Sequence, residues 1–423
     1  MFVNPIQHRE VNRMVETFQK IRSAMRGNLG VMIVTTGLWT LAGNLTTPFL
    51  ALYVLELGGS YVNIGEIFAL GAVIKVIPGF LGGYLADKMG RKKIVYTLSY
   101  MIASVALVRA FAPDYRWLML AAVLEAVFMG FREPSMSSII GDSTDPENRA
   151  MGYALLMVGP QLVGILSPSI IGVMMDRYGV RTAMMWGYLI VFALGTLASL
   201  IRQRHLEETL AKKEEVVLSP GSLSEIVSDF RDTVNSLSKP FKAFLLADFI
   251  FTFALGLGDP YYVTYATEGA KLSASQWGFI MSLVLLVHCA TLLLVASPSD
   301  EHGRVRFVLA SMISWPITYV LYVYTESFLA VLVVRIAITL SAAVGQPSWN
   351  ALFVDFCPKE HRGRFNALTT VVWSLLYGGG NYLGGVLFQN HGVGTPFLVA
   401  AAFMSVGAVI AVFTLKEPEK REE

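Results

Sequence analysis

The chain has 423 residues, of which 54% are hydrophobic and 15% charged, with a formal net charge of +2 and a mean hydropathy of +0.55. A soluble protein of this size would carry about 25% charged residues, so the composition excludes an ordinary soluble protein. Apolar runs of about 20 residues recur along the chain, and each can cross about 30 Å of hydrocarbon. These runs do not alternate with polar residues, which excludes a transmembrane β-barrel. We predict an all-α polytopic membrane protein with no nucleic-acid partner.

Hydropathy predicts twelve membrane spans in two sets of six, at residues 30–202 and 241–415. A polar arm (1–29), a charged linker (203–240) and a short tail (416–423) flank them. Apolar residues recur at helical spacing in the arm and in the linker, which predicts amphipathic helices on the bilayer surface; a flexible linker is the alternative. The predicted spans are about 30–55, 62–83, 94–113, 117–141, 150–175, 182–202, 241–266, 276–297, 306–325, 328–353, 366–388 and 395–415.

Lysine and arginine residues gather in alternate loops. One set of loops, which includes the arm, the linker and the tail, carries most of the basic residues. The loops on the other side hold only Arg116, Arg177, Arg181 and Lys271. The positive-inside rule therefore places both termini in the cytoplasm, and an even number of spans agrees. We expect a multi-pass protein of the plasma membrane.

A short basic hairpin separates the second and third predicted spans. Its sequence, G-x-L-A-D-K-x-G-R-K, runs from Gly83 to Lys92. A second copy, D-x-x-G-R, lies at Asp300–Arg304, 213 positions later (300 − 87 = 213) and again between two apolar spans. The hairpin resembles the signature loop of the major facilitator superfamily, which joins the second and third transmembrane helices.

The offset of 213 persists beyond this loop. It aligns Gly65 with Gly278, and the Gly-Val-x-Thr string at residues 179–182 with that at 392–395. It also places Lys75 opposite His288 inside the membrane. One register held across six spans predicts two six-helix bundles that are parallel repeats. This is the arrangement of the superfamily, so the resemblance covers nearly the whole chain.

The resemblance implies a conformational latch in these loops. In the superfamily the signature loop helps to hold the cytoplasmic side shut in the outward-facing state, and its arginine pairs with an acid at the end of the fourth span. Ordinary topogenic surface charges would give the same residue types. The latch residues implied are Gly83, Asp87, Gly90 and Arg91 with Asp142 in the first half, and Asp300, Gly303 and Arg304 with Asp355 in the second.

Ionisable residues inside spans are costly and usually face a bundle interior or a cavity. Glu125 and Arg132 lie two turns apart on one face of the fourth span, so we predict that they pair. In this hypothesis Glu125 carries a coupling proton, and Asp248 is the rival carrier. A fixed ion pair that only orients helices is the alternative, as is a packing pair of Arg132 with Glu133. The candidates for contact with substrate or proton are Asn44, Lys75, Glu125, Arg132, Glu133, Asp248, His288 and Arg335.

The fifth span contains Gly159, Pro160 and Gly164, which resemble the core of the antiporter motif of drug/proton exporters. Proline removes a helix hydrogen bond and glycine allows close packing, so the motif predicts a kink with a smooth face. The kink of any transporter helix would look the same.

The sequence has no phosphate-binding loop, metal-ligand cluster or catalytic triad, so we expect neither an enzyme nor a cofactor or metal. We predict a secondary transporter, functional as a monomer, that exports small amphipathic organic compounds in exchange for protons. Uptake or exchange of a small organic anion is the alternative, since the spans hold several cations. A receptor or scaffold that does not transport is the alternative from another class.

Overall fold

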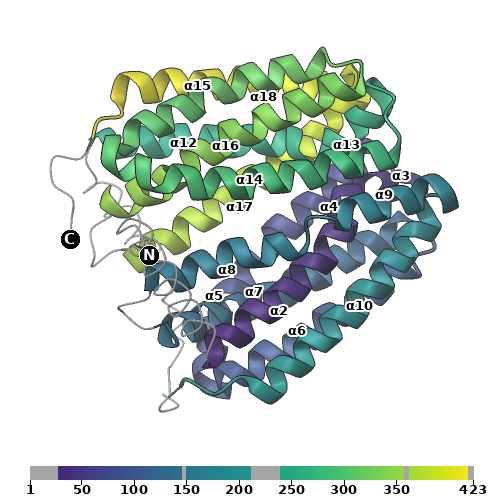
Figure 1. Ribbon diagram of the computed structural model, residues 1–423, viewed down its shortest axis with the longest axis vertical. Helices are drawn as coiled ribbons and strands as arrows, with labels where there is room; N and C mark the ends of the chain where they lie inside the picture. The colour runs from purple at the N-terminus through teal and green to yellow at the C-terminus, as the bar shows by residue number, and fades with distance from the viewer. Residues whose placement is uncertain (1–26, 145–148, 211–238, 357–361, 418–423) are drawn as a thin grey trace, which may run out of the picture.

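The computed structural model describes residues 27–144, 149–210, 239–356 and 362–417 (Figure 1). The amphipathic arm and the amphipathic linker helix predicted from the sequence lie almost entirely outside these residues.

The first bundle is an up-and-down array of helices in which three spans contain a break. The breaks are the 3₁₀ turn η1 after α2, the turn at Lys75 between α4 and α5, and a turn between α8 and α9. The elements are α2 (Gly27–Thr46), η1 (Thr47–Phe49), α3 (Leu50–Glu56), α4 (Tyr61–Ile74), α5 (Val76–Met89), α6 (Arg91–Ala110), α7 (Tyr115–Asp142), α8 (Arg149–Val163), α9 (Ser167–Tyr178) and α10 (Val180–His205).

The second bundle repeats the order of the first. Its first span is also interrupted, by the 3₁₀ turn η3 and the π-helical turn η4. The elements are α12 (Lys239–Gly258), η3 (Asp259–Tyr261), α13 (Tyr262–Thr264), η4 (Tyr265–Gly269), α14 (Ala274–His302), α15 (Arg304–Val323), α16 (Phe328–Phe356), α17 (Arg362–His391) and α18 (Thr395–Thr414).

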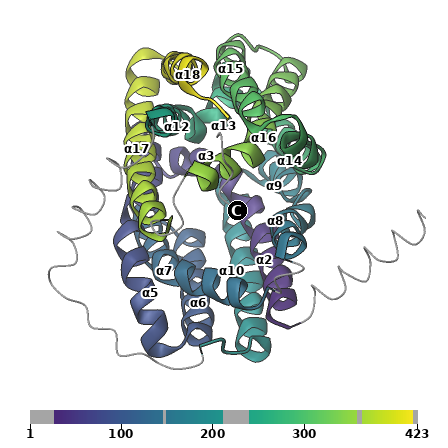
Figure 2. The same cartoon turned by 90° about the vertical axis from the view of Figure 1, so that its left-hand side faces the viewer.

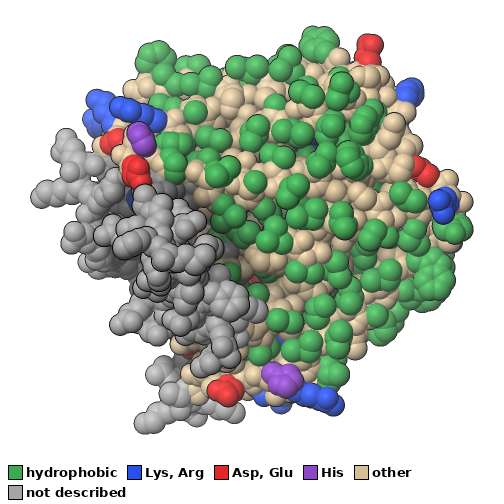
Figure 3. All heavy atoms as spheres, in the orientation of Figure 1, with side chains coloured by type: hydrophobic (Ala, Val, Ile, Leu, Met, Phe, Trp, Pro, Cys, Tyr) green, Lys and Arg blue, Asp and Glu red, His purple; other side chains and the backbone are tan. Residues whose placement is uncertain are grey.

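Ten of the helical segments are long and apolar enough to cross a membrane. Among the described residues, α7 and α17 run alongside them but fall short of that measure; α7 carries Arg116, Glu125, Arg132 and Glu133. Figure 3 shows hydrophobic side chains across the middle of the visible face, with charged side chains at its two ends. The surface thus has an apolar belt suited to lipid.

We call the end of the molecule that carries residues 206–210 and Lys239 the linker face, and the opposite end the far face. Figure 2 looks onto the linker face and shows the two bundles on either side of the centre. Gly90 and Gly303, 213 positions apart, have φ angles of 95° and 96° in the linker-face hairpins, and Gly179 and Gly392 have 79° and 100° at the far face. Because this backbone region favours glycine, the parallel repeat holds at the level of single torsion angles.

At the far face the bundles meet in two glycine-lined crossings, α9 on α14 and α17 on α4. A Cβ atom at Gly172 would collide with the backbone of Ala274, and one at Gly385 would collide with the backbone of Tyr61. The offset of 213 relates Gly172 to Gly385 and Tyr61 to Ala274. The two crossings are therefore the same contact made twice, once in each direction.

Reciprocal helix caps join the same crossings. The Asp176 carboxylate, at the end of α9, accepts the N–H groups of Ala274 and Ser275 at 3.1 Å each. At the equivalent place on α17, Gln389 accepts the N–H of Val62 at 3.4 Å. Each bundle thus satisfies donors that the first turn of a helix in the other bundle leaves free. We call these caps and the two crossings the far-face clamp.

The fold predicts which loops share a side of the membrane. In a background with Cys289→Ser and Cys357→Ser, cysteines introduced at Lys93 and Arg306 should react with an impermeant maleimide from one side of a sealed vesicle. Cysteines at Arg116 and Arg181 should react from the other side. Reaction of Lys93→Cys and Arg306→Cys from opposite sides would contradict the parallel repeat.

Loss of the Asp176 cap should weaken far-face closure. A carboxylate at a helix N-terminus contributes about 0.3–2 kcal/mol, so Asp176→Ala should raise far-face labelling of Thr47→Cys, in a cavity between the bundles, by up to roughly 30-fold. Asp114→Ala is the matched control, because Asp114 caps α7 within one bundle by accepting the N–H of Arg116 at 2.8 Å. Equal effects of the two substitutions would show that the cap between bundles has no special role.

Candidate functional site

A cavity of about 500 Å³ lies between the bundles. The first bundle lines it from α4, α6 and α7, and the second bundle from α12 and α17. Most of the lining is apolar or aromatic, with hydroxyl groups from the second bundle. Its polar and aromatic lining residues are Phe68, Lys75, Arg109, Glu125, Thr252, Thr370, Trp373, Ser374 and Tyr377.

Glu125 is in this central cavity, but its partner is not the predicted one. The carboxylate forms an ion pair with Arg109, in the last turn of α6, and the Arg109 guanidinium lies 5.7 Å from the ring centroid of Tyr188. The prediction of a Glu125–Arg132 pair is wrong, because two turns separate the residues by about 10.5 Å of rise and a neighbouring helix supplies a closer cation. Arg132 instead is buried inside the first bundle, where its Nη1 donates to Ser99 Oγ at 3.3 Å.

Lys75 lies where α4 gives way to α5, and it lines the central cavity and a second cavity of about 520 Å³. The second cavity extends toward the linker face along α5 and α7, where Glu133 and Ser137 line it. Among the described residues no ion-pair partner of Lys75 is found. The space between the bundles therefore continues toward the linker face, while the clamp covers the far face.

A third cavity, of about 260 Å³, lies on the far-face side of the central one and shares Phe68 and Tyr377 with it. Asp259 and Arg335 line this far subsite, together with Asn44, Thr47 and Trp277. Both Asp259 oxygens accept phenol groups, from Tyr319 at 3.2 Å and Tyr377 at 3.3 Å.

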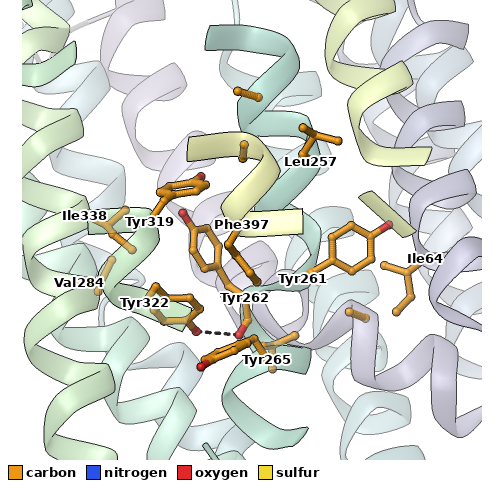
Figure 4. Packing of buried hydrophobic residues seen from close by; sticks show 14 of the residues in the cluster. Ile64, Leu257, Tyr261, Tyr262, Tyr265, Val284, Tyr319, Tyr322, Ile338 and Phe397 are labelled. Carbon is orange, nitrogen blue, oxygen red and sulfur yellow. Dashed lines mark hydrogen bonds between the residues drawn. The ribbon is translucent and has the colours of Figure 1, made fainter. Parts of the chain in front are cut away.

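Arg335 is 7% exposed, and its guanidinium lies 3.8 Å from the centroid of the Tyr262 ring. That ring is held by an aromatic cluster in which Tyr319, Tyr322 and Phe397 lie with centroids within 5.8 Å of it (Figure 4). The hydroxyl of Tyr322 donates to the Tyr262 carbonyl at 2.9 Å. The Tyr262 ring, against which the Arg335 guanidinium lies, is therefore held in place by packing and by this hydrogen bond.

The far subsite lies where the first span of each bundle is broken. Thr47 and Pro48 belong to η1, Asp259 and Pro260 belong to η3, and all four line the cavity. Irregular backbone at membrane depth is tolerated where it lines a cavity. Interruptions at corresponding positions of two repeats are a pointer to a binding site.

The other predicted site residues lie elsewhere. Asp248 accepts a hydrogen bond from the Trp373 indole and lines a separate cavity of about 320 Å³ inside the second bundle. His288 is half-buried on α14 and lines none of these cavities. Asn44 lines the far subsite and donates to the Gly164 carbonyl at 3.4 Å.

The predicted antiporter motif coincides with the break between α8 and α9. Helix α8 contains Gly159 and Pro160 and ends at Val163, and a turn at residues 164–166 precedes α9. A Cβ at Gly164 would lie 2.6 Å from Asn44 Nδ2 and 3.2 Å from the Thr40 carbonyl. Glycine therefore allows the break to pack closely on α2.

At the linker face Arg91 and Asp142 form an ion pair. The carboxylate of Glu208, just after α10, accepts the N–H groups of Arg91 and Lys92 at 3.1 Å each. In the second bundle Glu417, just after α18, accepts the N–H of Val305 at 2.8 Å. The side chains of Asp87, Asp300 and Asp355 lie outside what the structure describes, and so does the predicted Arg304–Asp355 contact.

Two charged site residues were not predicted from the sequence, Arg109 and Asp259. Arg109 lies in the last turn of its helix, where a cation is expected to serve the helix terminus. Asp259 lies in a Gly-Asp-Pro string that is typical of a turn at a span end. The signal that was available for Asp259 is that Thr47-Pro48, in the first half, also holds a proline near the end of the first span.

No cluster of three or more His, Cys, Asp or Glu residues suited to a metal ion occurs among the residues that the structure describes. The arrangement offers a largely apolar chamber, an ion pair in its wall and a smaller charged subsite behind it. Such a set of cavities has the size and polarity of a binding site for a small organic molecule.

Comparison with known proteins agrees with this arrangement. The family model of the Major Facilitator Superfamily matches residues 29–265 and 244–423. The multi-drug resistance efflux pump PmrA homolog of Lactococcus lactis is 26% identical, over 77% of this chain and 79% of that protein. The alpha-ketoglutarate permease of Escherichia coli is 25% identical, over 84% of each chain.

Solved structures show the same fold at low identity. The human organic anion transporter MFSD10 is 15% identical with a TM-score of 0.66, over 90% of this chain and 98% of that one. A peptide transporter POT in complex with sulfate is 14% identical with a TM-score of 0.72, over 93% and 97%. The chain is a transporter, not an enzyme, and it belongs to the Major Facilitator Superfamily.

Proposed function

We propose that the protein exports small amphipathic organic compounds from the cytoplasm by alternating access, in exchange for protons. The observation that carries the proposal is the cavity of about 500 Å³ between two bundles that the clamp closes at the far face. A volume of this size suits a drug-sized molecule, and such sites are mostly apolar with a few placed polar groups. A transporter of this kind alternates between two conformations, each closed at one face of the membrane. This structure is closed at the far face, and rocking of the bundles would produce the conformation that is open there.

Orientation follows from the basic residues. The linker face carries the Lys- and Arg-rich loops, so we place it in the cytoplasm of a plasma-membrane protein. The structure then corresponds to an inward-facing state. In the outward-facing state the signature loops would meet across the linker face, with Asp87, Asp300 and the Arg91–Asp142 pair acting as the latch.

Proton coupling is proposed for Glu125, with Asp248 as the rival. Glu125 is the acid among the described residues that line the central cavity, and it faces Arg109 from α6 and Tyr188 from α10. Lys75, between α4 and α5, lines the same cavity. Protonation of Glu125 would release Arg109 to a substrate anion or to Tyr188, and deprotonation would restore the pair. Asp248 lies outside the central cavity, which disfavours it as a group that senses substrate directly.

Transport of a small organic anion is the second candidate. It is favoured by Lys75, which lines both larger cavities and forms no ion pair with the described residues, although Glu125 and Glu133 line the same two cavities. An acceptor for this cation would come from the substrate. The name of the Escherichia coli relative is compatible with this candidate.

Glu125→Gln should abolish pH-gradient-driven accumulation of an amphipathic dye in reconstituted vesicles while sparing counterflow exchange, because exchange does not require proton release. Asp248→Asn, the comparison variant, should reduce accumulation less. Accumulation by Glu125→Gln together with its loss in Asp248→Asn would assign the proton to Asp248 and overturn the proposal.

Asp87→Asn should leave membrane insertion intact and slow transport, since a carboxylate at a helix end contributes about 0.3–2 kcal/mol to the state in which it is bound. Asp300→Asn should act in the same direction but more weakly, because the second loop lacks part of the signature sequence. Initial rates in vesicles, normalised to inserted protein, measure the effect. Unchanged rates in both variants would exclude a latch in these loops.

A further inference from the structure

We propose that the far subsite binds a zwitterionic head group of the transported compound, with the carboxylate on Arg335 and the amine beside Asp259. This inference rests on the proposed function and names the chemical class of its substrate. The apolar body of the same compound would occupy the adjoining central cavity, since Phe68 and Tyr377 line both spaces.

Arg335 is a buried cation short of acceptors. The residue is 7% exposed, and its Nε has no hydrogen-bond partner among the residues that the structure describes. Its Nη2 lies 3.9 Å from the sulfur of Met281, a weak acceptor. Its guanidinium also lies over the rings of Tyr262 and Trp277, at 3.8 and 5.7 Å from their centroids. A guanidinium presents donors in a planar fork that matches a carboxylate, so a ligand carboxylate is the acceptor that suits this site.

Asp259 supplies the opposite charge without neutralising Arg335 directly. The Arg335 charge acts on the Asp259 carboxylate, yet these two described residues form no ion pair. The carboxylate is held from the sides by the hydroxyls of Tyr319 and Tyr377. A cation beside it would also meet the aromatic faces that line the subsite, which attract ammonium groups.

Charge balance decides between ligand classes. Asp259 and Arg335 together are neutral, so an anion or a cation would leave one uncompensated charge in a buried site, which is costly. A zwitterion can compensate both charges and leave the site neutral. The volume of about 260 Å³ is below the range of about 300–1,000 Å³ for sites that hold a whole drug-sized ligand, so a head group fits better than a complete substrate.

The test uses four probes that share the phenylalanine side chain and differ in whether the amino group and the carboxyl group are charged. Phenylalanine is the zwitterion, N-acetylphenylalanine the anion, phenylalaninamide the cation and N-acetylphenylalaninamide the neutral member. Dissociation constants are measured by calorimetry on the purified full-length protein in lipid nanodiscs. Phenylalanine should bind roughly 10- to 100-fold more tightly than each other member, as expected for loss of one hydrogen-bonded charge.

Substitution of Arg335 and of Asp259 should change the order of affinities for the probes in opposite directions. Arg335→Gln should lose the preference for a carboxylate and favour phenylalaninamide, whereas Asp259→Asn should lose the preference for an amine and favour N-acetylphenylalanine. Arg335→Lys keeps the charge and should retain the preference for phenylalanine, which separates recognition from misfolding. Arg116→Gln, an exposed arginine at the far face, is the control and should change nothing.

A wild-type protein that binds the anion or the cation as tightly as phenylalanine would overturn the inference, and so would absence of binding by all four probes. Arg335→Gln and Asp259→Asn variants that fold but keep the wild-type order of the four probes would do the same. Dye transport in vesicles, measured on the same preparations, keeps the two proposals apart. Intact transport without a preference for the zwitterion rejects the subsite and leaves the proposed function standing.

Discussion

The contact on which the rest of the structure depends is the double crossing at the far face. Gly172 on Ala274 and Gly385 on Tyr61 bring helices of opposite bundles to backbone contact. That closeness lets Asp176 and Gln389 reach the first turns of α14 and α4. Because the two crossings are related by the repeat, they form two contacts with equivalent geometry. Helices held together at one end and spread at the other enclose the cavities described above.

The same crossings illustrate how helix ends are satisfied in a membrane protein. Ser273 and Gln276 form a capping box at the start of α14, and the repeat places Ser60 and Asn63 in the same roles at the start of α4. Each box leaves free donors, which the other bundle takes up through Asp176 or Gln389. Opening the far face must therefore give these donors to water at the membrane surface. That exchange costs about 0.5–1.5 kcal/mol for each hydrogen bond, which is small enough for a contact that would break in the proposed transport cycle.

The architecture could be predicted from the sequence because its signals are local or periodic. Span length, the alternation of basic loops and the offset of 213 each follow from one-dimensional patterns, and the paired φ angles of Gly90 and Gly303 show how closely the offset holds. The site was harder to predict. The cost of a charge inside a span led us to expect Glu125 beside a cavity, and the structure has it there. Spacing along one helix could not reveal that Arg109 of a neighbouring helix lies nearer than Arg132. A partner on another helix depends on rotation and packing, which one sequence does not specify.

One short segment contributes both to the far subsite and to the contacts that close the far face. The 3₁₀ turn Asp259–Tyr261 holds Asp259 in the far subsite, and two residues later the hydroxyl of Tyr261 donates to the Asn381 carbonyl at 2.7 Å and lies 3.4 Å from that of Tyr61. Trp277 is similar, since its ring faces Arg335 while its indole N–H donates to the Pro48 carbonyl of the other bundle at 3.2 Å. A ligand that reorients Asp259 or Arg335 would thus act on groups that hold the bundles together. A ligand shifts a conformational equilibrium only through different contacts in the two states. In the proposed transport cycle, these shared residues would therefore link occupancy of the cavity to opening of the far face.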